Sequence, residues 1–125
     1  MTLPPTLFLN AIEEFNHQQF FECHETLEDL WRPLSPSVEK TFYQGIIQIA
    51  VGLHHLQHGN LTGARNLLSA GLEKLNTLDP QCPDAAWIDL SRLIGEIRRV
   101  LENLQAEPLL PFPQIYLKTT IPSQE

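Results

Sequence analysis

The stretch TFYQGIIQIAVGLHHLQHGN, residues 41–60, decides the fold of this chain. Apolar side chains recur in it every three or four residues, which is the spacing of one face of a helix. The opposite face is nearly as apolar, and a helix with apolar residues on almost all sides lies at the centre of its bundle. Gly45 and Gly52 share one side of this helix, so we expect a partner helix to approach closely there. Gly59 and Asn60 end the helix.

Prolines and polar residues divide the rest of the chain into further helices. All ten prolines lie between runs of helical periodicity, where they separate one helix from the next. Asn16 is expected to cap the second helix, with Gln19 as its capping-box partner. Because no stretch shows the period of a strand followed by a hairpin turn, the sequence predicts an all-α, single-domain bundle of about five antiparallel helices. The expected spans are residues 5–15, 17–31, 35–58 or 37–58, 61–77 and 83–105.

The last twenty residues have no helical period. The sequence therefore predicts two parts, a helical bundle domain of residues 1–105 and an extended, proline-rich C-terminal arm of residues 106–125. A disordered tail is the alternative for this second part. In the first interpretation the apolar side chains of the arm pack across the bundle, and these are Leu109, Leu110, Phe112, Ile115 and Tyr116.

Length, composition and charge exclude several classes of protein. The 125 residues, 42 % of them apolar, match one globular domain. Eight basic residues against 15 acidic ones give a net charge of −7, which argues against duplex nucleic acid and anionic membranes as partners. The chain starts without the basic region of a signal peptide, and no apolar run approaches the roughly 20 residues that span a bilayer. Cys23 and Cys82 are no disulfide framework, so we expect a cytoplasmic protein.

The second and third helices carry the polar residues that could form a site. His24 lies in the apolar stripe of the second helix, and Glu28 stands four residues further on, within reach on the same face. Gln44, Gln48 and His55 follow one side of the third helix. The full candidate cluster is His24, Glu25, Glu28, Trp31, Gln44, Gln48 and His55. Glu25 points away from the stripe.

This cluster has two interpretations. In the first it is a buried network, in which His24 donates a hydrogen bond to Glu28 and the glutamines satisfy one another. Removal of the His24 side chain would then cost about 1–3 kcal/mol, because Glu28 would become a buried acceptor without a partner. In the second, His24, Glu28, Gln48 and His55 form a metal or acid–base site. The candidate metal ligands are His24, Glu28 and His55.

Two further histidines allow a metal site or a helix cap. His54 and His58 stand four residues apart and could chelate a metal on an exposed face. Imidazoles at the end of a helix also bond its last carbonyl groups and interact favourably with its dipole. The chain has no nucleophile, phosphate-binding or dinucleotide-binding motif. Trp31 and Trp87 are expected to anchor the core.

Two resemblances add to this interpretation. Locally, one helical hairpin resembles a single tetratricopeptide unit in the spacing of Gly52, Gly59, Leu61, Ala64, Leu68 and Leu72. The longer resemblance covers roughly residues 8–78 and is carried by Phe15-Asn16, the run from Phe20 to Glu28 with Trp31, the run from Tyr43 to Gln48, His54-His55, Gly59-Asn60 and Gly63-Ala64.

In these residues the chain resembles the domain-of-unknown-function 309 family, and its Pro-Phe-Pro tail resembles the cyanobacterial and plastid-type members. The resemblance implies a small all-α protein of the prokaryotic cytoplasm with no established activity. The signature positions of the family match here at His24, Glu25, Glu28, Trp31, Gln44 and Gln48.

From the sequence we favour a non-enzymatic helical protein that offers a groove to a peptide or protein partner. This hypothesis rests on the lack of a complete catalytic motif and on the apolar C-terminal arm. No nucleic acid, membrane or cofactor is expected as a partner, and a homodimer is a further hypothesis. The alternative is a metal-dependent, hydrolase-like enzyme that holds a divalent metal with His24, Glu28, Gln48 and His55.

Overall fold

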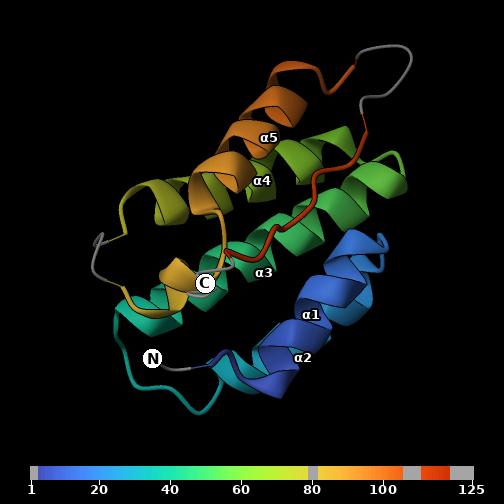
Figure 1. Cartoon of the computed structure of the whole chain (residues 1–125). Helices are drawn as coiled ribbons and strands as arrows, with labels where there is room; N and C mark the ends of the chain where they lie inside the picture. The colour runs from blue at the N-terminus through green and yellow to red at the C-terminus, as the bar shows by residue number, and fades with distance from the viewer. Residues whose placement is uncertain (1–2, 79–81, 106–110, 119–125) are drawn as a thin grey trace, which may run out of the picture.

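Five α-helices and one short 3-10 helix appear in this computed structural model, which describes residues 3–78, 82–105 and 111–118 (Figure 1). Successive α-helices pack against each other and run in opposite directions, so the predicted all-α bundle is confirmed. Within the described residues, no helix has the length and apolar character needed to cross a membrane. The elements are α1 (Thr6–Asn16), α2 (Phe20–Trp31), α3 (Val38–Gln57), α4 (Leu61–Asn76), η1 (Asp84–Trp87) and α5 (Leu90–Glu102).

The central helix is α3, which packs against α2, α4 and η1. Its interface with α4 is the most extensive, and glycines set the approach of the two helices. A Cβ atom added at Gly71 would lie 2.6 Å from the carbonyl oxygen of Gly45, and one added at Gly52 would lie 2.9 Å from Cγ of Leu68. Since a side chain cannot fit at these distances, the predicted close approach at Gly45 and Gly52 is confirmed.

Aromatic side chains join α1, α3 and η1 in the core. The ring of Phe8 lies 5.9 Å from that of Phe42 and 5.7 Å from those of Tyr43 and Trp87. The Tyr43 hydroxyl donates to Oδ2 of Asp84 at 2.7 Å, which connects α3 to η1. Burial, and then the bond to the Asp84 carboxylate, raises the pKa of Tyr43 well above its ordinary value, so the phenol keeps its proton as a donor.

The caps of α3 and α4 are polar side chains directly before each helix. Ser37 is the cap of α3, since its Oγ accepts a hydrogen bond from the backbone N–H of Lys40 at 3.2 Å. Asn60 caps α4 in the same way, accepting from the N–H of Gly63 at 2.9 Å. These two side chains select the start of each helix.

The turn between α1 and α2 differs from the prediction. Asn16 is the last residue of α1, and α2 begins at Phe20 and not at residue 17. Gln19 occupies the N-cap position of α2, but its side chain makes no capping hydrogen bond. The predicted capping box is wrong because the Asn16 side chain bonds instead to the backbone of Ile115. Gln18 closes the turn with a left-handed φ of 63°.

The fifth predicted helix also begins later than expected. Residues 84–87 form η1, Ile88 is extended with φ −126° and ψ 161°, and α5 starts only at Leu90. The carbonyl of Trp87 accepts from the N–H of Lys118 and the N–H of Asp89 donates to the carbonyl of Tyr116, both at 2.8 Å. Backbone groups committed to a distant segment cannot continue a helix, so this contact overrides the local helical period.

Candidate functional site

Residues 111–118, which we call the docked segment, cross the bundle in an extended conformation (Figure 1). They run between α1 and α2 on one side and α5 on the other, over α3 (Figure 1). The remaining residues of the predicted arm, 106–110 and 119–125, lie outside the described part of the chain. We call the surface that holds the docked segment the segment groove, and its contacts come from Asn16, Phe20, Trp87, Asp89, Arg92 and Glu96.

Asn16 contributes two of the hydrogen bonds to the docked segment. Its Oδ1 accepts from the backbone N–H of Ile115 at 2.7 Å, and its Nδ2 donates to the carbonyl of Ile115 at 2.9 Å. One primary amide therefore matches both backbone polar groups of a residue, as a neighbouring β-strand would. Both bonds are partly buried, which shields them from competing water.

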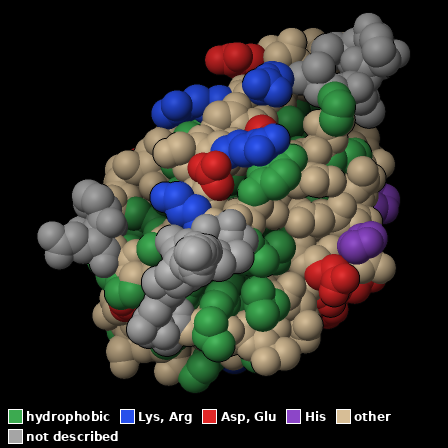
Figure 2. All heavy atoms as spheres, viewed as in Figure 1, with side chains coloured by type: hydrophobic (Ala, Val, Ile, Leu, Met, Phe, Trp, Pro, Cys, Tyr) green, Lys and Arg blue, Asp and Glu red, His purple; other side chains and the backbone are tan. Residues whose placement is uncertain are grey.

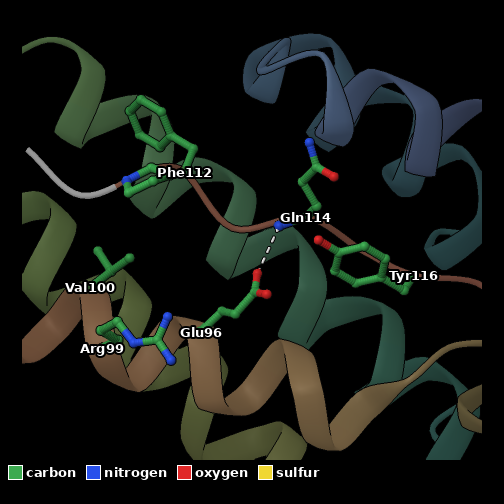
Figure 3. A pocket seen from close by; sticks show the side chains of 7 residues that line it. Glu96, Arg99, Val100, Phe112, Gln114 and Tyr116 are labelled. Carbon is green, nitrogen blue, oxygen red and sulfur yellow. Dashed lines mark hydrogen bonds between the residues drawn. The ribbon is translucent and has the colours of Figure 1, made fainter.

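Glu96 on α5 holds the residue before Ile115. One carboxylate oxygen, Oε1, accepts from the N–H of Gln114 at 3.0 Å, and the other lies 3.3 Å from Nε of Arg92 (Figure 3). The backbone bonds of residues 116 and 118 to residues 87 and 89 continue the same pattern. The groove therefore binds the docked segment through hydrogen bonds to the segment's backbone. Every peptide has these backbone groups.

Side chains of the docked segment alternate between groove and solvent. Ile115 is 3 % exposed and Pro113 is buried, whereas Gln114 is exposed. The ring of Phe112 lies 5.4 Å from that of Phe20 on α2. Burial of alternate residues is the pattern of a half-buried strand, and it gives the groove a preference for apolar side chains at these positions.

Basic side chains gather on α5 beside the docked segment. In Figure 2 basic side chains lie above the segment with acidic ones among them, while hydrophobic side chains are exposed below it, toward the N-terminus. The helix carries Arg92, Arg98 and Arg99 against two glutamates, in a chain of net charge −7. The guanidinium carbon of Arg92 lies 3.7 Å from the centre of the Tyr116 ring, a cation–π contact. The α5 side of the groove therefore presents basic residues beside Asp89 and Glu96.

The predicted contact between His24 and Glu28 is present, but it lies at the surface. Nε2 of His24 is 3.5 Å from Oε2 of Glu28, and the two side chains are 19 % and 36 % exposed. Glu28 also lies 3.3 Å from Nη2 of Arg32. Among the described residues no charged or polar residue is buried as a whole, so the predicted burial of this pair is wrong.

The tautomer of His24 follows from its second contact. Nδ1 lies 2.9 Å from the carbonyl oxygen of Phe21, which can only accept, so Nδ1 carries the proton. Nε2 of the neutral ring then has a lone pair toward the Glu28 carboxylate. The pair is an ion pair only when the imidazole is protonated.

The glutamines of α3 do not satisfy each other as predicted. Gln44 and Gln48 are half-buried, and Oε1 of Gln48 is buried without a hydrogen-bond partner. Nε1 of Trp31 is likewise buried and unpartnered, while Nζ of Lys40 lies 4.5 Å above the centre of the Trp31 ring. Glu25 is exposed on the outer face of α2.

His55 packs at the junction of α3 and α4, not toward α2. A Cβ atom added at Gly63 would lie 2.9 Å from the His55 ring, and Nδ1 of His55 is 3.3 Å from Nδ2 of Asn60. The imidazole that reaches α2 is that of His54, whose ring lies 5.5 Å from that of Phe21. The sequence therefore predicted the wrong one of two adjacent histidines as the residue that faces α2.

His54 and His58 show the capping arrangement that the sequence allows. Their rings are 4.4 Å apart, and Nδ1 of His58 bonds to the backbone carbonyl of His54 at 2.9 Å. No group of three or more His, Cys, Asp or Glu side chains within the described ranges could hold a metal ion. His24, Glu28 and His55 therefore do not meet as the three ligands that the metal hypothesis requires.

Sequence reasoning missed Asn16 and Glu96 as contacts of the docked segment. Asparagine at a helix boundary is usually a cap, which is why the local pattern favoured that role for Asn16. Glu96 had a weak signal, because Arg92, Glu96 and Arg99 are four and three residues apart and share a helix face. A helix face of alternating charge beside an apolar stripe is usually exposed to water, but it can equally lie against a bound segment.

Fold and groove together define a small all-α protein that holds an extended segment across its helices. Residues 8–67 match the family model described as "Domain of unknown function (DUF309)", which confirms over these residues the resemblance read from the sequence. The matched range includes Asn16 and Phe20 of the segment groove, whereas α5 and the docked segment lie beyond it.

Two curated bacterial proteins are similar to this chain. The uncharacterized protein YpuF of Bacillus subtilis (strain 168) is 30 % identical over 102 residues, which cover 81 % of this chain and 58 % of YpuF. An uncharacterized protein of Aquifex aeolicus (strain VF5) is 31 % identical over 120 residues, 95 % of this chain and 33 % of that protein. The chain thus spans less than two thirds of either relative. No solved structure matches it.

Proposed function

We propose that this chain is a non-enzymatic binding module that holds an extended peptide segment of a protein partner in the segment groove. The observation that carries this proposal is the pair of hydrogen bonds between the Asn16 amide and the main chain of Ile115. An extended peptide usually binds by pairing with a strand edge. Here a side-chain amide supplies the same donor and acceptor from a helix. In the unbound chain, the docked segment occupies the place of the partner.

The contacts of the docked segment indicate the chemistry of the partner segment. A side chain in the place of Ile115 would be enclosed, and those in the places of Phe112 and Tyr116 would lie against an aromatic ring and a guanidinium. Proline at position 113 restricts the free peptide to extended conformations and so lowers the entropy lost on binding. We therefore propose partners that are extended, contain proline and are apolar at alternate residues.

The cysteines support the cytoplasmic location that we propose for this activity. Cys23 and Cys82 are both free and buried. Burial raises the pKa of each thiol above its ordinary value, which keeps both protonated and unreactive.

The proposal is tested by binding of a labelled synthetic peptide, residues 111–118, to full-length chain whose own segment has been released. Ile115→Asp places a carboxylate in an enclosed position, and Gln114→Pro removes the N–H that Glu96 accepts without changing a core side chain. We expect saturable binding to both variants in fluorescence anisotropy. Wild type should bind more weakly, because its groove is largely occupied.

A matched pair of asparagine variants provides the control. Asn16→Ala added to either release variant should weaken peptide binding about tenfold, the loss expected for two partly buried hydrogen bonds. Asn10→Ala removes an exposed asparagine of the same helix and should leave binding unchanged. Circular dichroism verifies that each variant keeps its helices. Failure of both folded release variants to bind, or equal binding with and without Asn16, would contradict the proposal.

A further inference from the structure

A cavity of about 340 Å³ lies between α5 and the docked segment (Figure 3). One wall belongs to α5 and the other to the docked segment, so the cavity exists only while the segment is in the groove. Its volume falls at the lower end of the range of small-molecule sites, about 300–1,000 Å³. The lining residues are Glu96, Arg99, Val100, Pro111, Phe112, Gln114 and Tyr116.

The two charged residues of the cavity differ in their partners. The Glu96 carboxylate is committed, since its oxygens bond to Gln114 N–H and Nε of Arg92. Arg99 forms no ion pair with any described residue, and its backbone carbonyl accepts a hydrogen bond from Nδ2 of Asn103. The cavity therefore presents one guanidinium that has no ion-pair partner among the described residues, beside a carboxylate that is already bonded.

Apolar and flat surfaces form the rest of the lining. Phe112 and Tyr116 contribute aromatic rings, and Pro111 and Val100 contribute aliphatic surface (Figure 3). A guanidinium pairs with a carboxylate through two parallel hydrogen bonds, and aromatic side chains pack against flat apolar groups. One charged anchor beside a flat apolar lining is complementary to a ligand with the same two parts.

We propose that this cavity binds a small aromatic carboxylate, with its anionic group on Arg99 and its ring against Phe112 and Val100. Such a ligand bridges α5 and the docked segment, so it binds the occupied groove and not the open one. By linkage, it then stabilises the docked segment and lowers the affinity of the groove for a partner peptide. This regulatory consequence rests on the proposed function, whereas binding of the carboxylate itself does not.

The test is a titration of the full-length wild-type chain with 2-naphthoate, followed by the fluorescence of the naphthoate. We expect saturable binding that Arg99→Gln weakens about tenfold, the effect of one lost charge-assisted pair. Arg98→Gln is the matched control, because Arg98 lies next in sequence but bonds to Oδ1 of Asn76 on the exposed surface. The neutral 2-naphthamide should bind more weakly than the carboxylate.

Two results would overturn the cavity proposal. One is a lack of saturable binding to folded wild type. The other is an equal loss in the Arg98 and Arg99 variants, which would indicate general attraction of anions to α5. Hydrogen exchange provides a second measurement. Bound 2-naphthoate should slow the exchange of the Ile115 and Lys118 amides. Unchanged exchange would also contradict a ligand that bridges the two walls.

The cavity proposal and the proposed function fail in different ways. If the peptide binds the Ile115→Asp chain but naphthoate does not bind wild type, the cavity inference is wrong and the groove remains. If naphthoate binds through Arg99 but the peptide binds no release variant, the cavity inference holds and the proposed function fails. If both bind, naphthoate should tighten binding of the peptide to the Ile115→Asp chain, because the bound peptide restores the same cavity wall. Unchanged binding would count against a ligand that bridges the two walls.

Discussion

Asn16 shows how one side chain can serve a distant part of the chain in place of its own helix. Its amide bonds to the residue at position 115, a separation of 99 residues along the sequence. A local window that ends at the next helix contains Asn16 but not Ile115, so it misses the partner in both bonds. Local sequence therefore predicts that Asn16 is a helix cap. This prediction is wrong because the side chain bonds to Ile115 instead.

Asn16→Ala should lower the free energy of unfolding by about 1–3 kcal/mol, because it leaves both backbone groups of Ile115 without partners in a partly buried place. Urea denaturation measures this loss. Asn10→Ala, at an exposed site on the same helix, should change stability by less than about 0.5 kcal/mol. Equal effects of the two substitutions would show that the bonds to Ile115 contribute nothing.

His24→Ala should cost less than about 1 kcal/mol, not the larger loss expected for a buried pair. The reason is that Glu28 is 36 % exposed and keeps Arg32 as a partner after the imidazole is removed. Thermal melts at neutral pH, beside Glu25→Ala as a surface control, measure the difference. A loss above about 2 kcal/mol would mean that His24 is more tightly enclosed than its exposed fraction indicates.

At this scale the sequence predicted contacts within one helix better than contacts between helices. The spacing of four residues was enough to pair His24 with Glu28. The choice between His54 and His55 depends on where α2 and α4 lie around α3, and adjacent residues differ by about 100° on a helix. Placement of neighbouring helices is a tertiary property that the spacing of one helix does not contain.

Glycine contacts at the α3–α4 interface permit a prediction about helix packing. Gly71→Ala should destabilise the chain by about 1–3 kcal/mol, because its Cβ would lie 2.6 Å from a backbone oxygen that cannot rotate away. Gly95→Ala should instead stabilise it by about 0.5–1 kcal/mol, since nothing lies within 4 Å of the added atom on α5. Chemical denaturation of the two variants measures both signs. A stabilising Gly71→Ala would contradict the close approach.

The face shared by α2 and α3 should weaken in acid. Partial burial, then the neighbouring His58, His55 and His24, lowers the pKa of His54 in the folded chain below its ordinary value, and Glu22 opposes this. The unfolded chain therefore takes up the proton first, and stability falls as pH drops below about 6.5, the ordinary pKa of histidine.

Melting temperatures between about pH 7.5 and pH 5.5 check this prediction. His54→Gln should flatten the decline, whereas His17→Gln, an exposed histidine that bonds to the Glu13 carbonyl, should leave it as in wild type. A decline that is identical in the His54 variant would assign the acid sensitivity to other groups.

Periodicity at the scale of elements predicted the helices where local and tertiary preferences agree. Helix α4 begins at the predicted Leu61, and α3 begins at Val38, one residue after the later of its two predicted starts. The prediction failed at η1, where residues 87–89 bond to the docked segment and leave the helical path. The likeness of the α3–α4 hairpin to a tetratricopeptide unit stays a prediction.

The molecule as a whole is a bundle that keeps an extended segment in place across helices from both of its ends. Asn16 and Phe20 come from the part that matches the DUF309 model, while Glu96, Arg92 and the docked segment come from beyond it. The all-α class and the order of helices could be predicted from the sequence alone. The residues that contact the docked segment could not, because these contacts join residues far apart along the chain.

The central claim is that the groove binds a peptide through the Asn16 amide, and side-chain amide NMR tests it most directly. Isotope-labelled Ile115→Asp chain is titrated with the unlabelled peptide of residues 111–118. The account predicts a saturable shift of the Asn16 side-chain amide signals and an unchanged Asn10 signal. An unshifted Asn16 amide in a chain that binds the peptide, with changes confined to the α2–α3 histidine face, would contradict it.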